Sequence, residues 1–309
     1  MGNAVRKMSI PHVPSAERSK KEMKGTIMDG KTPRIVLITG ASSGIGKACA
    51  LHLYKKGCRV YGTSRTAQDL PMTSVREEDR SPTFELIPMD VNSGESIERA
   101  VEFVVNREDR LDVLVNCAGY GLAGAAEDTR EEEARDQVET NFFGVFRLCR
   151  SVLPIMRQQR AGYVVNVSSI GGLIGIPFQS LYSASKFAVE GFTEALRAEV
   201  HQFGIQVVLI EPGDFHTGFT AHRRKAIAAE ENPVYRELFA RALGVMEADE
   251  MNGSTPGKIG PLLERIITTR SPRARYRIGP ASERLAVELK KVMPSRLFEW
   301  AIMKYYQLR

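Results

Sequence analysis

Tyr182 and Lys186 form the pair whose residue types and spacing are best suited to proton transfer. Residues four positions apart share one face of a helix, with about 5 to 6 Å between their β-carbons. A phenol with a pKa of about 10 is a poor acid or base at neutral pH, but a nearby ammonium stabilises the phenolate and lowers that pKa. Because this spacing also arises by chance, the surrounding residues must decide whether the pair is functional.

Polar residues precede this pair at positions suited to a ligand site. Ser168 and Ser169 follow a predicted strand that ends at Val167, and open α/β sheets bind ligands at the carboxyl ends of their strands. A serine there can hydrogen-bond a substrate oxygen, although a simple turn would account for one of the two. Asn141 falls inside a predicted helix, where asparagine is unfavourable, so a local polar contact or a functional role must retain it.

A glycine-rich turn, Thr39–Gly46, directly follows the first predicted strand. Glycines at such a turn let the backbone approach a pyrophosphate held at the N-terminus of the next helix. The spacing G-x-x-x-G-x-G differs from the G-x-G-x-x-G fingerprint, and a glycine-rich turn can also simply connect a strand to a helix. We predict a dinucleotide site here, with the connecting turn as the alternative.

Arg65 follows the second predicted strand, at the position where a site for NAD would hold the ribose hydroxyl with a carboxylate. A guanidinium there instead suits a 2′-phosphate, so we predict NADP(H) as the cofactor and consider NAD(H) the less favoured choice. A solvated loop charge is the alternative for Arg65. Asp90, after the third strand, has two equal interpretations, as an acceptor for the adenine amino group or as part of a plain turn.

Short β-branched runs alternate with helical stretches from Arg34 onward, a pattern typical of a parallel sheet with helices on both faces. We therefore predict an α/β fold: a Rossmann-like, doubly wound parallel sheet of about seven strands in a single domain with a helical lid. The predicted strands are residues 34–39, 59–62, 83–88, 111–115, 163–167, 206–210 and 276–278, and the predicted helices are 47–56, 96–106, 130–159 and 181–203.

Composition along the chain predicts three parts. Residues 1–32 lack periodicity and are predicted to form a flexible N-terminal extension. Residues 33–280 form the predicted Rossmann-like, dinucleotide-binding catalytic domain, in which 214–260 interrupts the alternation and suits a substrate lid. Residues 281–309 are predicted to form an amphipathic helical tail, which either packs on its own domain or makes a peripheral membrane or dimer contact.

The overall composition excludes several classes of protein. Apolar residues make up 43% and charged residues 26% of the 309 residues, as in ordinary globular proteins. The net charge of +6 is spread along the chain without a nucleic-acid motif, so no nucleic-acid partner is expected. The four cysteines lack metal-ligand spacing and indicate buried thiols, not a metal site. With no apolar run long enough to span a bilayer, the expected location is the cytoplasm.

Several motifs share the order and spacing found in one enzyme family. They are Thr39–Gly46, Asn116–Gly119, Asn141, Ser169, Tyr182 with Lys186, and Pro212–Gly213. Through them the sequence resembles the short-chain dehydrogenases/reductases, strongly over residues 33–220. Residues 169–173 and 211–217 bring it closest to the 17β-hydroxysteroid dehydrogenase-like branch.

The resemblance implies a catalytic tetrad of Asn141, Ser169, Tyr182 and Lys186. Tyr182 would be the general acid/base, and Ser169, thirteen residues earlier, would orient the substrate carbonyl. Lys186 would lower the pKa of Tyr182 and hold the nicotinamide ribose, while Asn141 would keep a water in a proton relay. A homodimer or homotetramer is also expected.

For the cofactor, the resemblance implies that residues 116–119 brace the sheet beside the adenosine half and that Thr217 meets the nicotinamide carboxamide. The predicted cofactor-binding residues are Thr39, Gly40, Ser42, Ser43, Gly44, Ile45, Gly46, Arg65, Asp90, Val91, Asn116, Ala118, Gly119, Tyr182, Lys186, Pro212, Gly213 and Thr217.

The expected substrate is a small hydrophobic ketone, aldehyde or alcohol of steroid, retinoid or lipid type. Apolar residues after Ser169 and at the start of the lid are expected to line its pocket, although about half of them would equally suit the core. A non-catalytic regulator that senses NADP(H) with the same fold is the alternative, and the intact tetrad argues for the enzyme. The apolar residues are Leu173, Ile174, Ile176, Pro177, Phe178, Phe215 and Phe219.

Overall fold

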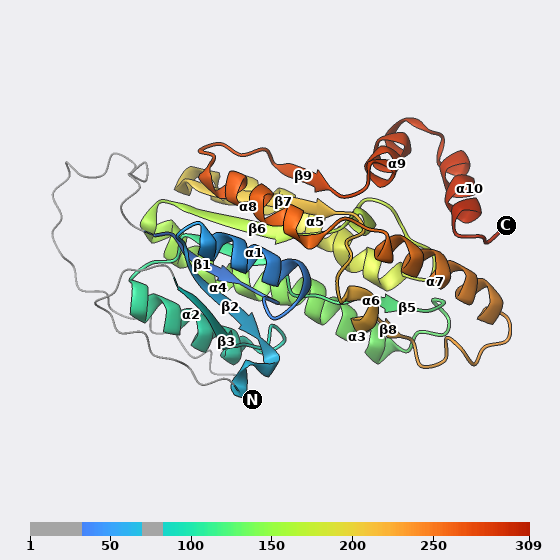
Figure 1. The fold of residues 1–309 in the computed structure, drawn as a ribbon, viewed down its shortest axis with the longest axis horizontal. Coiled ribbons are helices and arrows are strands. Elements are labelled where there is room, and N and C mark those ends of the chain that lie inside the picture. The colour runs from blue at the N-terminus through green and yellow to red at the C-terminus, as the bar shows by residue number, and fades with distance from the viewer. Residues whose placement is uncertain (1–32, 70–82) are drawn as a thin grey trace, which may run out of the picture. The chain divides into compact units, whose positions relative to one another are not determined.

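Seven short strands form one wholly parallel sheet in the order β3-β2-β1-β4-β6-β7-β9, as the computed structural model shows (Figure 1). The strand order reverses between β1 and β4, which confirms the predicted doubly wound, Rossmann-like sheet. The structure describes residues 33–69 and 83–309, so the predicted extension at 1–32 lies outside the described residues. The strands are β1 (Ile35–Ile38), β2 (Arg59–Ser64), β3 (Phe84–Pro88), β4 (Val113–Asn116), β6 (Gly162–Val167), β7 (Ile205–Pro212) and β9 (Arg275–Ile278).

Helices cover both faces of this sheet because successive side chains on each strand point to opposite sides. Val36 and Ile38 pack in a cluster with α1 and α8, whereas Ile35 and Leu37 pack in a second cluster with α2, α4 and α5. Helix α8, which the sequence did not lead us to predict, lies beside α1. These helices are α1 (Gly44–Lys55), α2 (Gly94–Glu108), α4 (Gly144–Gln159), α5 (Ser180–Val200) and α8 (Ile259–Thr268).

The helix predicted over 130–159 is confirmed by an unbroken helical run over 131–159, in which a π-helical turn at Glu139–Phe143 separates α3 (Glu131–Val138) from α4. Such turns insert one extra residue and often mark functional positions. This turn contains the buried side chain of Asn141, whose amide bonds to backbone outside the helix. The unfavourable asparagine is thus accommodated by local π geometry.

Between β7 and α8 the chain forms a small substructure over the ends of the strands. It contains α6 (Phe219–His222), β8 (Arg224–Lys225) and α7 (Arg236–Met251), and β8 pairs in parallel with β5 (Leu122–Ala123). A separate apolar cluster, distinct from the two sheet clusters, holds it together. The buried residues of that cluster are Ala123, Ala226, Ala229, Phe239 and Leu243.

After β9 the chain ends in two helices, α9 (Ala281–Val292) and α10 (Ser295–Tyr305), drawn in red at the C-terminus in Figure 1. Only Val287 and Phe298 are buried, in a cluster with Ile174. No helix within 33–69 or 83–309 is long and apolar enough to cross a membrane. The remaining short helices are η1 (Arg65–Asp69), η3 (Ile170–Gly172), η4 (His201–Phe203) and η5 (Pro256–Lys258).

Candidate active site

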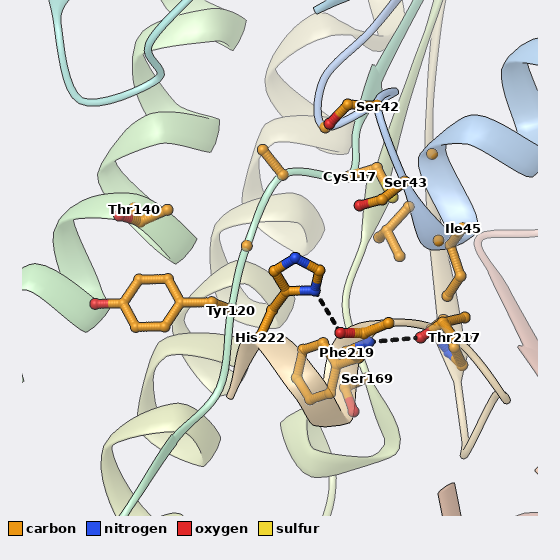
Figure 2. Close-up of a pocket in the computed structure, with 18 of the residues that line it drawn as sticks. Ser42, Ser43, Ile45, Cys117, Tyr120, Thr140, Ser169, Thr217, Phe219 and His222 are labelled. Carbon is orange, nitrogen blue, oxygen red and sulfur yellow. Dashed lines mark hydrogen bonds between the residues drawn. The ribbon is translucent and has the colours of Figure 1, made fainter. Parts of the chain in front are cut away.

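A cavity of about 600 Å³ lies at the carboxyl ends of β1, β2, β4, β6 and β7, where a doubly wound sheet binds its ligands. The glycine-rich turn forms one side, and the start of α5 together with the segment after β7 forms another. Figure 2 shows Ser42, Ser43 and Ile45 at the glycine-rich turn, with Ser169 and Phe219 further along the cavity; Thr217 lies between them, since a β-carbon on Gly44 would be 3.7 Å from its Cβ atom. The cavity therefore joins the two groups of motifs.

The glycine-rich turn has a conformation that only glycine adopts easily. Gly40 and Gly44 have φ values of 67° and 53°, in the left-handed region. A β-carbon on Gly46 would lie 2.3 Å from the carbonyl oxygen of Gly40, so a side chain there would force the turn open. Ser42 and Ser43 are exposed to the cavity, and the first turn of α1 carries no acidic residue. Backbone and hydroxyl donors at a helix N-terminus fit an anionic pyrophosphate.

Thr39 and Asn116 are buried behind the turn and do not line the cavity. The hydroxyl of Thr39 accepts hydrogen bonds from the backbone N–H of Cys117 and of Ala118, at 2.9 and 2.8 Å. The Asn116 amide donates to Asn166 at 2.8 Å. Thr39 and Asn116 thus hold the β4 segment in place. The cofactor would instead be contacted by the neighbouring residues that line the cavity. The other predicted cofactor residues line the cavity.

Arg65 lies directly after β2 with an exposed side chain that lines the cavity. A 2′-phosphate as the partner of Arg65 stays a prediction. Asp90 and Val91 also line the cavity. The Asp90 carboxylate accepts a hydrogen bond from the backbone N–H of Asn92 at 3.0 Å, so the turn interpretation of Asp90 is met. The other carboxylate oxygen of Asp90 would be the acceptor for the adenine amino group, and this second interpretation stays a prediction.

Tyr182, Lys186 and Ser169 lie in the same part of the cavity. Tyr182 and Lys186 stand on α5, and Ser169 precedes η3, where its hydroxyl accepts a hydrogen bond from Gly171 N at 3.0 Å. Ser169 and Tyr182 both lie against Gly171, where an added β-carbon would be 3.4 Å from Ser169 Oγ and 3.1 Å from Tyr182 Cε1. The Lys186 ammonium lies 5.9 Å from the centre of the Tyr182 ring and donates to the carbonyl oxygen of Val167 at 3.0 Å.

Asn141 lies outside the cavity lining, although it was predicted as part of the tetrad. Its amide oxygen accepts from the backbone N–H of Tyr120, and its amide nitrogen donates to Tyr120 O and to the Ser185 hydroxyl, at 3.1, 3.0 and 3.1 Å. These hydrogen bonds of the Asn141 side chain connect the π-helical turn to α5 and to the loop after β4. In this arrangement Asn141 positions the residues around the site.

Burial sets the protonation of the two central groups. Burial raises the pKa of Tyr182 to about 12, with a smaller opposing effect from the Ser169 hydrogen bond. Burial also lowers the pKa of Lys186 to about 8, with the Cys117 and Glu190 charges opposing the change. Desolvation of the phenol is the largest of these effects, and the lowering of the Tyr182 pKa by Lys186 stays a prediction. Both groups carry their protons at neutral pH.

The substrate end of the cavity is more polar than expected. Of the predicted apolar wall, Ile176, Phe215 and Phe219 line it, whereas Leu173 and Ile174 pack under the C-terminal helices. Phe178 packs against the Phe239 ring in the small cluster over the strand ends. Polar residues that were not among the predicted site residues also line this cavity. These residues are Gln179, Asp214, His222, Arg224 and Glu250.

The fold and the cavity together define a dinucleotide-binding α/β protein with a tyrosine, a serine and a lysine at its centre. The short chain dehydrogenase family profile matches residues 34–228. A 3-ketodihydrosphingosine reductase of Bacteroides thetaiotaomicron is 43% identical over 277 residues, covering 90% of this chain and 99% of the relative.

Two further comparisons agree with this result. Human retinol dehydrogenase 8 is 38% identical over 255 residues, 79% of this chain and 80% of that protein. A crystal structure of a short-chain dehydrogenase from Streptomyces avermitilis superimposes with a TM-score of 0.72 at 35% identity, covering 88% of this chain and 98% of that one. The chain belongs to the short-chain dehydrogenase/reductase family and is an oxidoreductase that uses NAD(P)(H).

The protonation of Lys186 gives a pH prediction. If the ammonium stabilises negative charge on Tyr182, kcat/KM for carbonyl reduction should fall as pH rises through about 8, where Lys186 loses its proton. In the Lys186→Arg variant the decline should move to higher pH, because a guanidinium keeps its charge. The measurement is kcat/KM against pH at saturating cofactor for both proteins. A wild-type profile that stays flat well above pH 8 contradicts the need for this charge.

Proposed function

We propose that this protein is an NADP(H)-dependent reductase that converts a hydrophobic, lipid-like ketone or aldehyde into an alcohol. The observation that carries the proposal is the buried Tyr182, which lies with Ser169 and Lys186 inside the cavity that the glycine-rich turn also lines. A phenol that keeps its proton at neutral pH is ready to donate it to a carbonyl oxygen.

The dinucleotide, when bound, supplies the hydride. Ser42, Ser43 and the backbone at the start of α1 would hold its pyrophosphate, and Arg65 its 2′-phosphate. Thr217 and Gly213, which line the cavity after β7, would face the nicotinamide end. The Thr217 hydroxyl accepts a hydrogen bond from Phe219 N at 3.1 Å, which fixes its orientation.

Tyr182 transfers its proton to the substrate oxygen while Ser169 keeps the carbonyl aligned with the phenol. The Lys186 ammonium, fixed by the Val167 carbonyl oxygen, stabilises the negative charge that Tyr182 gains. Asn141 contributes indirectly, because its hydrogen bonds hold Tyr120 and Ser185 in position. Because its amide is occupied by those groups, the predicted water relay through Asn141 would have to use its backbone.

The names of the relatives support a lipid-like substrate. One is named a 3-ketodihydrosphingosine reductase and another a retinol dehydrogenase, and both names refer to lipid substrates. In this chain Ile176, Phe215 and Phe219 provide the apolar contacts at the substrate end. The regulator that senses NADP(H) without turnover is disfavoured by the presence of Ser169, Tyr182 and Lys186 in one cavity.

Tyr182→Phe should lower kcat by about 10²-fold or more while NADPH binding is retained, because the ring is kept and the proton donor is lost. Activity is measured as NADPH consumption with a panel of steroid, retinoid and fatty ketones, and binding by fluorescence titration. Tyr54→Phe, at an exposed position on α1, is the matched control and should behave as wild type. If the wild type binds NADPH but consumes none with any carbonyl, the alternative function, a regulator that senses NADP(H) without turnover, replaces the proposed reductase.

Arg65→Asp should reverse the cofactor preference. A guanidinium bonded to a 2′-phosphate contributes about 1.5 to 3 kcal/mol, so it gives NADPH an advantage of about tenfold to a hundredfold over NADH. A carboxylate there repels the phosphate and accepts a bond from the free ribose hydroxyl. The measurement is the ratio of kcat/KM with the two cofactors, with Arg99→Asp on the exposed surface of α2 as control. An unchanged ratio in Arg65→Asp would mean that another group reads the phosphate.

We also propose that α9 and α10 lie on an anionic membrane surface. Leu285, Leu289 and Val292 form one exposed apolar face of α9, while Leu297 and Trp300 are exposed on α10. Lys290 and Lys291 stand next to the apolar face of α9, an arrangement typical of interfacial helices. Such a contact would bring a lipid-like substrate to the cavity.

Deletion after Pro294 should reduce co-sedimentation with phosphatidylglycerol vesicles while NADPH binding persists, because the dinucleotide residues all precede β9. Lys290→Glu with Lys291→Glu should weaken vesicle binding without removing α10. Phosphatidylcholine vesicles are the control lipid. Equal sedimentation of the deleted and intact proteins would contradict the membrane contact, and loss of NADPH binding would show that α10 completes the core.

The homodimer or homotetramer predicted for this chain is tested separately, by sedimentation of the protein without vesicles.

A further inference from the structure

Glu190 is a buried carboxylate that none of the proposed catalytic steps uses. It lies four residues after Lys186 on α5, so the two side chains share one face of the helix. Both reach the sheet from there: the Lys186 ammonium donates to Val167 O at the end of β6, and Glu190 pairs with Arg275 on β9. Glu190 does not line the cavity, so any part it plays in the reaction must pass through another residue.

The guanidinium of Arg275 is shared by three carboxylates. It pairs with Glu190, with Glu211 on β7 at 2.8 Å, and with Glu194 on the next turn of α5 at 3.0 Å. The side chains of Glu190 and Glu211 are 7% and 1% exposed, whereas that of Arg275 is 33% exposed. One partly exposed guanidinium thus serves two buried carboxylates and an exposed one. The Oε1 atom of Glu190 has no hydrogen-bond partner within residues 33–69 and 83–309.

This negative charge lies next to the strand end that holds Lys186. Glu211 stands on β7, one residue beyond the partner of Val167 in the ladder between β6 and β7. Arg277, opposite Glu211 on β9, comes within 3.4 Å of that carboxylate, but it also pairs with Glu288 on α9. The two arginines therefore compensate the buried carboxylates only in part, and the rest of their field acts on Lys186.

Three titratable groups in the described part of the chain act on the Lys186 ammonium. They are the Tyr182 phenol and the Glu190 carboxylate on α5, and the Cys117 thiol in the loop after β4. The phenol and the thiol keep their protons at neutral pH, because burial raises the pKa of Tyr182 to about 12 and that of Cys117 to about 11. Of the three groups, Glu190 is therefore the one that can supply a negative charge.

The surroundings of Glu190 hold it in its ionised form. Burial raises its pKa, the Ser168 hydroxyl and Arg275 lower the pKa, and the Glu211 charge adds to the rise. Arg197 on α5 is a further cation that interacts with Glu190. Because the guanidinium of Arg275 is in direct contact with the carboxyl group, Glu190 carries its charge at neutral pH.

We propose that Glu190 is a positioning residue whose buried carboxylate, held by Arg275, keeps Lys186 cationic while Tyr182 gives up its proton, an assignment that rests on the reductase function proposed above. A carboxylate one helical turn away and shielded from water acts on the ammonium more strongly than an exposed one would. Stability alone does not require this group, because replacing a buried ion pair by apolar side chains is often neutral. Glu190 therefore extends the electrostatics of the site to β7 and β9.

Glu190→Gln should move the fall of kcat/KM, expected for the wild type at about pH 8, to a pH about one unit lower, with activity well below that pH close to wild type. The fold should persist because Arg275 keeps Glu211 and Glu194 as partners. Glu194→Gln removes an exposed partner of the same guanidinium and is the matched control, with an unchanged profile. In a Lys186→Arg background, Glu190→Gln should leave the profile unchanged, because a guanidinium keeps its charge.

A ¹³C NMR titration of lysine-labelled protein follows the Lys186 Cε signal, assigned by its loss in Lys186→Arg, and gives the midpoint without substrate or turnover. The midpoint should fall by about one pH unit in Glu190→Gln and in Glu190→Met, which removes the charge without leaving an unpaired amide. An unchanged midpoint in a folded variant, or a loss of kcat/KM that is equal at every pH, would overturn the role of Glu190 and leave the reductase intact. A lower midpoint in a protein that reduces no carbonyl would instead overturn the reductase and retain the link between Glu190 and Lys186.

Discussion

The position of α5 against the strand ends is the constraint on which the site depends. Asn166, buried on β6, accepts a hydrogen bond from Asn116 on β4 and donates to Thr193 on α5, each at 2.8 Å. Asn141 adds a second link to α5 through Ser185. Because these amides are buried, their bonds cannot be exchanged for water, and a shift of α5 would leave them unpaired. Tyr182 and Lys186 therefore stay at fixed positions on the cavity wall.

The same burial that fixes these side chains also sets their chemistry. Desolvation disfavours both the phenolate and the ammonium, so it raises one pKa and lowers the other. Below about pH 8 both Tyr182 and Lys186 are protonated, which suits proton donation from Tyr182 to a carbonyl. Lys186 retains its charge partly through Glu190, one helical turn further along α5. Glu190 in turn pairs with Arg275 on β9, so the edge strand contributes to the electrostatics of the site.

The C-terminal helices are joined to both loops that line the substrate end. The Glu283 carboxylate on α9 accepts a hydrogen bond from Asp214 N at 3.0 Å, beside Gly213 in the segment after β7. Burial and the adjacent Glu283 carboxyl raise the pKa of Asp214 well above its usual range. Lys290 donates to the carbonyl oxygen of Leu173 in the loop after Ser169. A surface that binds α9 would thus act next to the cavity.

The sequence by itself determined the sheet and the glycine-rich turn and placed Tyr182 and Lys186 on one helix face, whereas the choice of Ser169 over Ser168 rested on the family resemblance. Those features depend on local patterns: strand periodicity, glycine conformation and the four-residue spacing on a helix. Tertiary structure alone decided that Asn141 sits in a π-helical turn and that Thr39 lies behind the cavity, where it holds the segment after β4. It also decided that Leu173 and Ile174 pack under α9. Burial and pairing depend on contacts between residues distant in the chain, which no local pattern encodes.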